Sequence, residues 1–133
     1  MKRKRPTPGK RKRLTSGERT LIYNKFNGRC AYCGAKIQQD EMQVDHVIPL
    51  RIGGEDVPAN MFPACRSCNH YKRGNSLEGW RKMLEQLPRT LERDCYSYRQ
   101  AVRFGLVAPQ NHKVRFWFEL PWEYRRAVTI LDR

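Results

Sequence analysis

Apolar residues recur at helical spacing near the start of the chain and then begin to alternate with polar residues. Thr15 or Ser16 can cap a helix that extends to about residue 27, and Gly28 can end it. The apolar residues on or near one face of this helix are Leu21, Ile22, Tyr23 and Phe26. From residue 41 to residue 48 the alternation predicts a short strand, followed by a turn at the glycines 53–54.

The second half of the chain has mainly helical periodicity. Residues 66–72 predict the start of a helix, and Ser76 caps a further helix that Pro88 is expected to close. Another helix is expected from about residue 90 to residue 103, with Cys95 on its apolar face as a buried free thiol. Alternation over 113–119 predicts a strand, and a short helix from about residue 121 completes the chain.

The charge balance points to a polyanionic partner. The chain of 133 residues has a formal net charge of +14, which favours nucleic acid as the partner and, as an alternative, an anionic membrane surface. No stretch approaches the roughly 20 apolar residues that a bilayer span requires, and the N-terminus has no apolar core of the kind that a secretory signal needs. We therefore expect a soluble protein of the cytoplasm.

The basic residues are concentrated at the N-terminus. The first 13 positions contain no acidic residue and are interrupted by Pro6, Pro8 and Gly9, so we expect residues 1–14 to form a disordered basic arm that follows phosphates without reading sequence. The alternative is an end that only adds solubility. The basic residues of the arm are Lys2, Arg3, Lys4, Arg5, Lys10, Arg11, Lys12 and Arg13.

Four of the five cysteines form two Cys-x-x-Cys pairs, Cys30 with Cys33 and Cys65 with Cys68. Two such pairs can complete a tetrahedral sulfur site for Zn²⁺. With all four positions held by thiolates, the ion has no open position for water, so its role is structural. The long loop between the pairs is then held closed by the metal.

That loop and the residue after it contain the candidate catalytic groups. Asp45-His46 is followed by a Gly-Gly pair and Asn60, and Asn69 comes directly after Cys68. A histidine beside a carboxylate, with two amides brought near by a structural metal, can assemble a metal-assisted hydrolytic centre. This run closely resembles the HNH endonuclease family, in the subclass with four zinc-binding cysteines, over about residues 30–75. The resemblance implies an α+β fold with a zinc-stabilised ββα-metal (His-Me) finger flanked by helices.

The resemblance also implies a role for each matching residue. His46 would be the general base, Asp45 a ligand of one catalytic Mg²⁺ or Mn²⁺, and Asn60 a brace that orients the histidine. Asn69 would be the second metal ligand, with the neighbouring His70 as the alternative. Because neighbouring side chains of a strand point to opposite faces, we expect the strand to bend at residues 45–46.

Further basic residues are candidate contacts to the DNA backbone. Lys72 matches a basic position of the family, with an exposed solubilising lysine as its alternative interpretation. Arg73 would lie on or beside the same helix, and Arg51 and Arg66 are weaker candidates. Residues 15–133 would then form one nuclease domain, with residues 76–133 as an extension of helices and a short strand.

The leading hypothesis is a metal-dependent DNA endonuclease, a hydrolase acting on phosphodiester bonds. One alternative is a zinc-stabilised nucleic-acid-binding module without catalysis. Another is a nuclease that acts as a homodimer or as a subunit of a phage, restriction or packaging complex. By resemblance, the expected setting is a bacterial or phage-infected cell.

Overall fold

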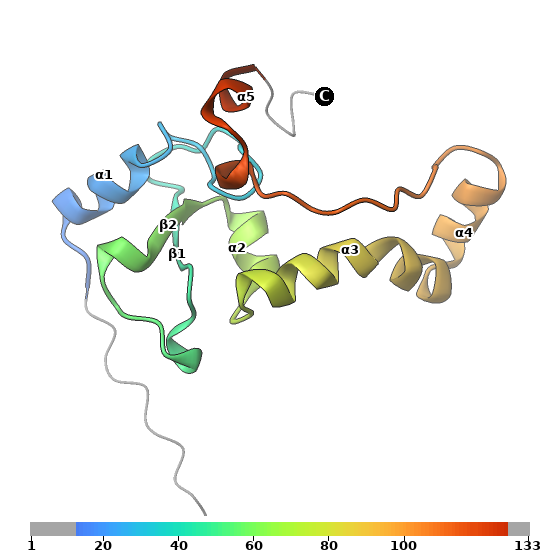
Figure 1. The fold of residues 1–133 in the computed structure, drawn as a ribbon, viewed down its shortest axis with the longest axis horizontal. Coiled ribbons are helices and arrows are strands. Elements are labelled where there is room, and N and C mark those ends of the chain that lie inside the picture. Colours follow the sequence, from blue (N-terminus) through green and yellow to red (C-terminus); the bar gives the residue numbers. More distant parts are fainter. Residues whose placement is uncertain (1–12, 128–133) are drawn as a thin grey trace, which may run out of the picture.

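A two-stranded antiparallel sheet and the helix that follows it lie at the centre of the fold. The computed structural model describes residues 13–127 (Figure 1). Strand β1 (Gln43–His46) pairs with β2 (Met61–Ala64), with Gln43 opposite Ala64 and His46 opposite Met61. Helix α2 (Arg66–Lys72) follows β2 almost directly and packs on β1. The expected α+β class, with its ββα order, is therefore confirmed.

The residue pattern does not predict strand β2, which only the resemblance to a ββα finger implies. Its four residues include Pro63, which cannot donate a ladder hydrogen bond and which weakens any strand signal. The carbonyl of Pro63 accepts a hydrogen bond from the Ala31 amide at 2.9 Å. This contact ties β2 to the turn that carries the first cysteine pair.

Helix α1 (Ser16–Asn24) begins as the sequence predicts and ends slightly earlier than expected. Thr15 and Glu18 form a reciprocal capping box, with both side-chain to backbone distances at 3.1 Å. Ile22 is buried against Met42 and Met61, so the helix packs on the sheet. Leu21 is 60% exposed and lies outside this contact, contrary to the predicted apolar face.

An aromatic core joins the C-terminal extension to the finger. Tyr32 meets Trp80 with ring centroids 5.0 Å apart, and Trp80 stacks on Phe116 at 4.7 Å. The backbone amides of Trp117 and Phe118 donate to the carbonyls of Tyr32 and Ala31 at 2.9 and 2.8 Å. The extension therefore returns to the finger and covers the cysteine turn.

The extension departs from prediction at three places. Helix α3 (Leu77–Asp94) is capped by Ser76 as expected but continues through Pro88, because a proline removes one helical N–H donor without stopping the residues beyond it. Cys95 separates α3 from α4 (Tyr96–Arg103), and its thiol is only half-buried. The predicted strand over 113–119 is instead an extended segment that ends in a 3₁₀ turn, Trp117–Glu119.

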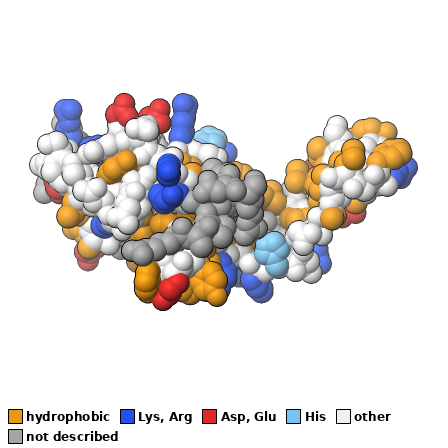
Figure 2. Space-filling view, turned by 90° about the horizontal axis from the view of Figure 1, so that it is seen from above, with side chains coloured by type: hydrophobic (Ala, Val, Ile, Leu, Met, Phe, Trp, Pro, Cys, Tyr) orange, Lys and Arg blue, Asp and Glu red, His pale blue; other side chains and the backbone are white. Residues whose placement is uncertain are grey.

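The remaining parts of the extension lie at its two ends. Helix α5 (Trp122–Ala127) forms near where a short helix was predicted. The α4 end projects from the rest of the molecule and carries exposed apolar side chains, among them Tyr96, Phe104 and Leu106 (Figure 2). Within residues 13–127, no helix combines the length and apolarity needed to cross a bilayer. The predicted disordered arm falls on residues 1–14, of which 1–12 lie outside the described residues.

Candidate active site

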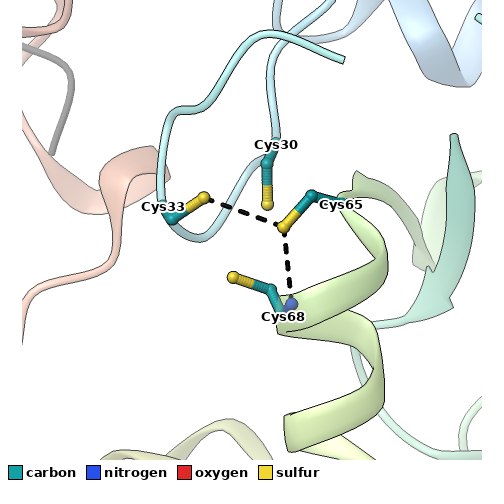
Figure 3. A group of neighbouring side chains, drawn as sticks. All are labelled: Cys30, Cys33, Cys65 and Cys68. Atoms are coloured by element: carbon teal, nitrogen blue, oxygen red, sulfur yellow. Dashed lines mark hydrogen bonds between the residues drawn. The ribbon is translucent and has the colours of Figure 1, made fainter. Parts of the chain in front are cut away.

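The four paired cysteines converge on one point. All four Sγ atoms lie within 4.8 Å of one another, and the side chains point toward a common centre (Figure 3). The sulfurs of Cys33 and Cys65 are 3.9 Å apart. Four sulfurs at the usual Zn–S distance of about 2.3 Å stand about 3.8 Å apart in a tetrahedron. These residues could therefore hold a metal ion such as zinc.

Local structure explains the convergence. The first cysteine turn, residues 30–33, closes with a 2.9 Å hydrogen bond from the Gly34 amide to the Cys30 carbonyl. Gly34 has a φ of +79°, and a Cβ there would overlap the Trp117 ring at 2.4 Å. The second cysteine turn, residues 65–68, is the start of α2, where Cys65 caps the helix and accepts from the Cys68 amide at 3.4 Å.

The thiols perturb one another's protonation. A hydrogen bond with Cys33 lowers the pKa of Cys30 to about 7. Hydrogen bonds with Cys30 raise the pKa of Cys33 and of Cys68 far above that of a free thiol. Without a cation the four sulfurs must share protons, whereas a bound dication stabilises the thiolates directly.

The first cysteine turn and the end of α2 each supply a hydrogen-bond donor to Asp45. This carboxylate, in β1, is 5% exposed. It accepts from the hydroxyl of Tyr32, which lies between Cys30 and Cys33. It also accepts from the ammonium of Lys72, at 3.2 Å from Oδ1 and 3.0 Å from Oδ2. Burial raises the pKa of Tyr32, so its phenol stays protonated and donates.

The position of Lys72 corrects its predicted role. Its side chain is completely buried, pairs with Asp45 and also donates to the backbone carbonyl of His46 at 3.0 Å. Neither a phosphate contact nor an exposed solubilising lysine fits this position. Lys72 lies on the face of α2 that packs on β1, and helical position rather than residue type decides its burial.

His46 has a carboxylate partner that the sequence predictions missed. Its Nε2 lies 2.8 Å from Oδ1 of Asp56, with the two side chains 15% and 29% exposed. Asp56 belongs to the loop between the strands, two residues after the Gly-Gly pair. The sequence signal was a pair of acidic residues, Glu55 and Asp56, between the glycines and Asn60, and it does not say which of the two meets the histidine.

Asn60 fixes the loop that carries Asp56. Its amide nitrogen donates to the carbonyls of Ile48 and Glu55, each at 2.9 Å, and its oxygen accepts from the Ile48 amide at 3.0 Å. At Gly54 a Cβ would lie 1.8 Å from the Ile48 carbonyl oxygen, so the loop closes too tightly for any side chain there. Asn60 thus braces the loop, and Asp56 rather than Asn60 contacts the His46 ring.

A cavity of about 320 Å³ brings most of the candidate residues together. The polar residues that line it are Asp45, His46, Arg51, Asn69 and Arg73. His70 and Arg66 are exposed and do not line it. Strand pairing continues through His46, and both Asp45 and His46 line this cavity. Of the predicted arm, Arg13 is described, and it lines a second cavity with His46 and Asp56.

Comparison with known proteins identifies the segment that carries this geometry. Residues 30–85 match the model of the HNH endonuclease family. The chain is 35% identical over 66 residues to the "SPbeta prophage-derived putative HNH endonuclease YoqL" of Bacillus subtilis (strain 168), an alignment that covers 41% of this chain and 27% of that protein. The predicted resemblance to this family is confirmed, and the chain spans about a quarter of the length of that relative.

A solved structure is similar over a longer part of the chain. The Type II-C Cas9 enzyme from Actinomyces naeslundii aligns with a TM-score of 0.47 and 25% sequence identity. The alignment covers 57% of this chain and 9% of that enzyme.

Proposed function

We propose that this protein is a metal-dependent DNA endonuclease that hydrolyses phosphodiester bonds. The observation that carries the proposal is the cavity shared by Asp45, His46 and Asn69, which lies within the segment that matches the HNH family. A carboxylate, an imidazole and an amide around one solvent-accessible space are the groups that metal-assisted hydrolysis requires.

The residues around this cavity fit a hard divalent cation. Asp45 and Asn69 offer oxygen atoms, which Mg²⁺ and Mn²⁺ prefer. Within the described residues no hydrogen bond occupies the side-chain amide of Asn69, and the Asp45 carboxylate keeps acceptor capacity beyond its bonds to Tyr32 and Lys72. When bound there, the ion would neutralise negative charge on the phosphate and on the departing oxygen.

His46 would act as the general base. Its imidazole accepts a proton from water, and the water oxygen forms a bond to phosphorus while the bond from phosphorus to the 3′ oxygen breaks. The 3′ oxygen takes a proton from solvent, which leaves a 3′-hydroxyl and a 5′-phosphate. Arg51 and Arg73 line the same cavity, where their guanidinium groups can contact phosphates on either side of the reacting one.

A plasmid nicking assay with a series of divalent cations tests the proposal. We expect the wild-type protein to nick DNA with Mg²⁺ or Mn²⁺, and His46→Ala to lose at least about 100-fold in rate, because the positioned base is gone. His112→Ala, at an exposed histidine in the extended segment before the 3₁₀ turn, serves as the control and keeps full activity. Zinc content and circular dichroism confirm that each variant is folded.

The same assay separates this proposal from a binding module without catalysis. Binding to DNA with no cleavage under any cation, at any protein concentration, favours the module. Cleavage by His46→Ala at the wild-type rate rejects the assignment of the base.

A further inference from the structure

We propose that Asp56 is a positioning residue that fixes the tautomer of His46. It holds the ring hydrogen on Nε2, so that the lone pair of the neutral imidazole is on Nδ1, which becomes the basic nitrogen. This inference rests on the proposed function, since it refines how His46 accepts the proton.

The contact itself selects the tautomer. Nε2 of His46 lies 2.8 Å from Oδ1 of Asp56. An ionised carboxylate can only accept hydrogen bonds, so a neutral imidazole at this distance must carry its hydrogen on Nε2. Within the described residues no hydrogen bond engages Nδ1 of His46, and that nitrogen keeps its lone pair for a proton from water.

The loop between the strands keeps Asp56 in place. Asn60 donates to the carbonyl of Glu55, the residue before Asp56, and also to the carbonyl of Ile48, two residues after His46. One amide side chain therefore ties the chain next to the base to the chain next to its carboxylate partner. Asn60 would then orient His46 indirectly, by holding Asp56 at hydrogen-bond distance.

His46 lies between two cavities, and their lining residues agree with different roles for its two ring nitrogens. His46 lines the cavity that contains Asp45 and Asn69, and it also lines the second cavity, which Asp56 shares with Arg19. Asp56 is absent from the lining of the first cavity. The carboxylate can thus hold Nε2 without occupying the space proposed for water and phosphate.

The proton balance follows from this arrangement. Water transfers a proton to Nδ1, which gives an imidazolium with hydrogens on both nitrogens, and the Nε2 hydrogen stays bonded to Asp56. The carboxylate stabilises the positive charge that appears on the ring. Without Asp56 the two neutral tautomers compete, and the tautomer protonated on Nδ1 cannot act as the base.

The first part of the test is steady-state nicking by Asp56→Asn. The asparagine has the same shape, but its amide can donate to Nε2 and stabilise the unproductive tautomer. We expect kcat to fall by about 100-fold or more with little change in KM, by analogy with the aspartate of a catalytic triad, whose replacement by asparagine has a large effect on kcat. Glu55→Gln is the matched control, because it neutralises the adjacent exposed carboxylate and retains the backbone carbonyl bonded to Asn60.

The second part reads the tautomer directly and needs no cleavage. In ¹⁵N spectra of the zinc-loaded full chain, at a pH where His46 is neutral, wild type and Glu55→Gln should show protonated Nε2 and unprotonated Nδ1. Asp56→Asn should shift the population toward protonated Nδ1. A wild-type tautomer in Asp56→Asn, or an unchanged kcat while His46→Ala is inactive, overturns the role of Asp56 and leaves the proposed function intact. If no cation supports cleavage by the wild type, the proposed function fails, and the spectra still decide the tautomer.

Discussion

A buried carboxylate is stable only when its charge is paired, and Asp45 meets this requirement with Tyr32 and Lys72. The donors come from different parts of the chain, one inside the first cysteine turn and one at the end of α2. Because one donor lies in the first cysteine turn and the other on the helix that the second turn begins, the position of Asp45 depends on how the turn and the helix pack. The proposed metal ligand and the four cysteines are therefore linked through Tyr32 and α2.

Replacing Tyr32 by phenylalanine measures the contribution of this cluster to stability. We expect Tyr32→Phe to lower the free energy of unfolding by about 1.5–3 kcal/mol, since a hydrogen bond to a buried charge is lost while the ring packing is kept. Tyr23→Phe is the matched control, because the Tyr23 hydroxyl donates to a neutral carbonyl, that of Ile37, at 2.9 Å. Its loss should be about 0.5–1.5 kcal/mol.

Urea denaturation of the zinc-loaded proteins measures both values. Equal losses for the two variants would show that the charge on Asp45 adds nothing to the Tyr32 hydrogen bond.

The sequence predicts which residues surround the cavity better than it predicts the contacts that these residues make. The sequence predicts Asp45, His46 and Asn69 as site residues, because their types and spacing match a known motif. The burial of Lys72 and the partner of His46 could not be derived, since both depend on how the loop and α2 fold back on β1. Asp56 in particular lies ten residues from His46, and its contact with the histidine exists only once the loop has closed.

At the scale of elements, the loop from residue 47 to residue 60 determines the geometry of the site. It starts at the end of β1, closes through Asn60 and leads into β2. Gly53 and Gly54 are adjacent in it but have different constraints. Gly53 has a φ of +98° and open space around its Cα, whereas Gly54 lies directly against the Ile48 carbonyl.

Alanine substitutions at the two glycines should separate these constraints. Gly53→Ala should lower the free energy of unfolding by about 1–2 kcal/mol, the cost of a left-handed backbone conformation with a side chain. Gly54→Ala should cost about 3 kcal/mol or more, because backbone atoms have to move to admit the Cβ.

Nicking assays and urea denaturation of both alanine variants provide the comparison. Gly54→Ala should also lose more nicking activity than Gly53→Ala, since the backbone movement that admits the Cβ displaces Asn60 and Asp56. An undisturbed, fully active Gly54→Ala protein would contradict the tight closure of this loop.

The predicted elements agree with the structure where local signals dominate. The capping box of α1 and the Ser76 cap of α3 are local features, and both helices start where the sequence indicates. The structure differs from the sequence prediction at Pro88, which α3 passes through, and over residues 113–119, where tertiary packing decides the conformation. Phe116 and Trp117 are buried rather than part of a sheet. The backbone amides of Trp117 and Phe118 donate to the cysteine turn, and the amide of Phe116 donates to the Glu119 carboxylate.

At the scale of the whole molecule, the charge is divided between the arm and the fold. Of the +14, eight charges belong to residues 1–13. The remaining positive charge includes Arg51 and Arg73, which line the cavity. Arg13, at the junction, lines the second cavity beside His46, so the arm would leave the fold next to the proposed base.

Deleting residues 2–12 tests the role of the arm and leaves Arg13 in place. We expect weaker DNA binding and a slope of log K against log salt that is smaller by up to about 6, because seven basic residues are removed. A variant with the same arm residues in scrambled order should bind like the wild type, since phosphates are contacted without reading sequence. Fluorescence anisotropy at several salt concentrations provides the measurement, and an unchanged slope would show that the arm is not in contact with DNA.

The position of Tyr32 between two cysteines also has a consequence for inhibition. A compound that withdraws a metal from the four sulfurs, or an oxidant that draws two of them together, would deform the turn that supplies one of the donors to Asp45. Such an agent would disturb the Asp45 carboxylate through Tyr32. It would not have to enter the cavity or compete with DNA. The cysteine cluster is therefore a point at which the site could be inhibited without a ligand in the cavity.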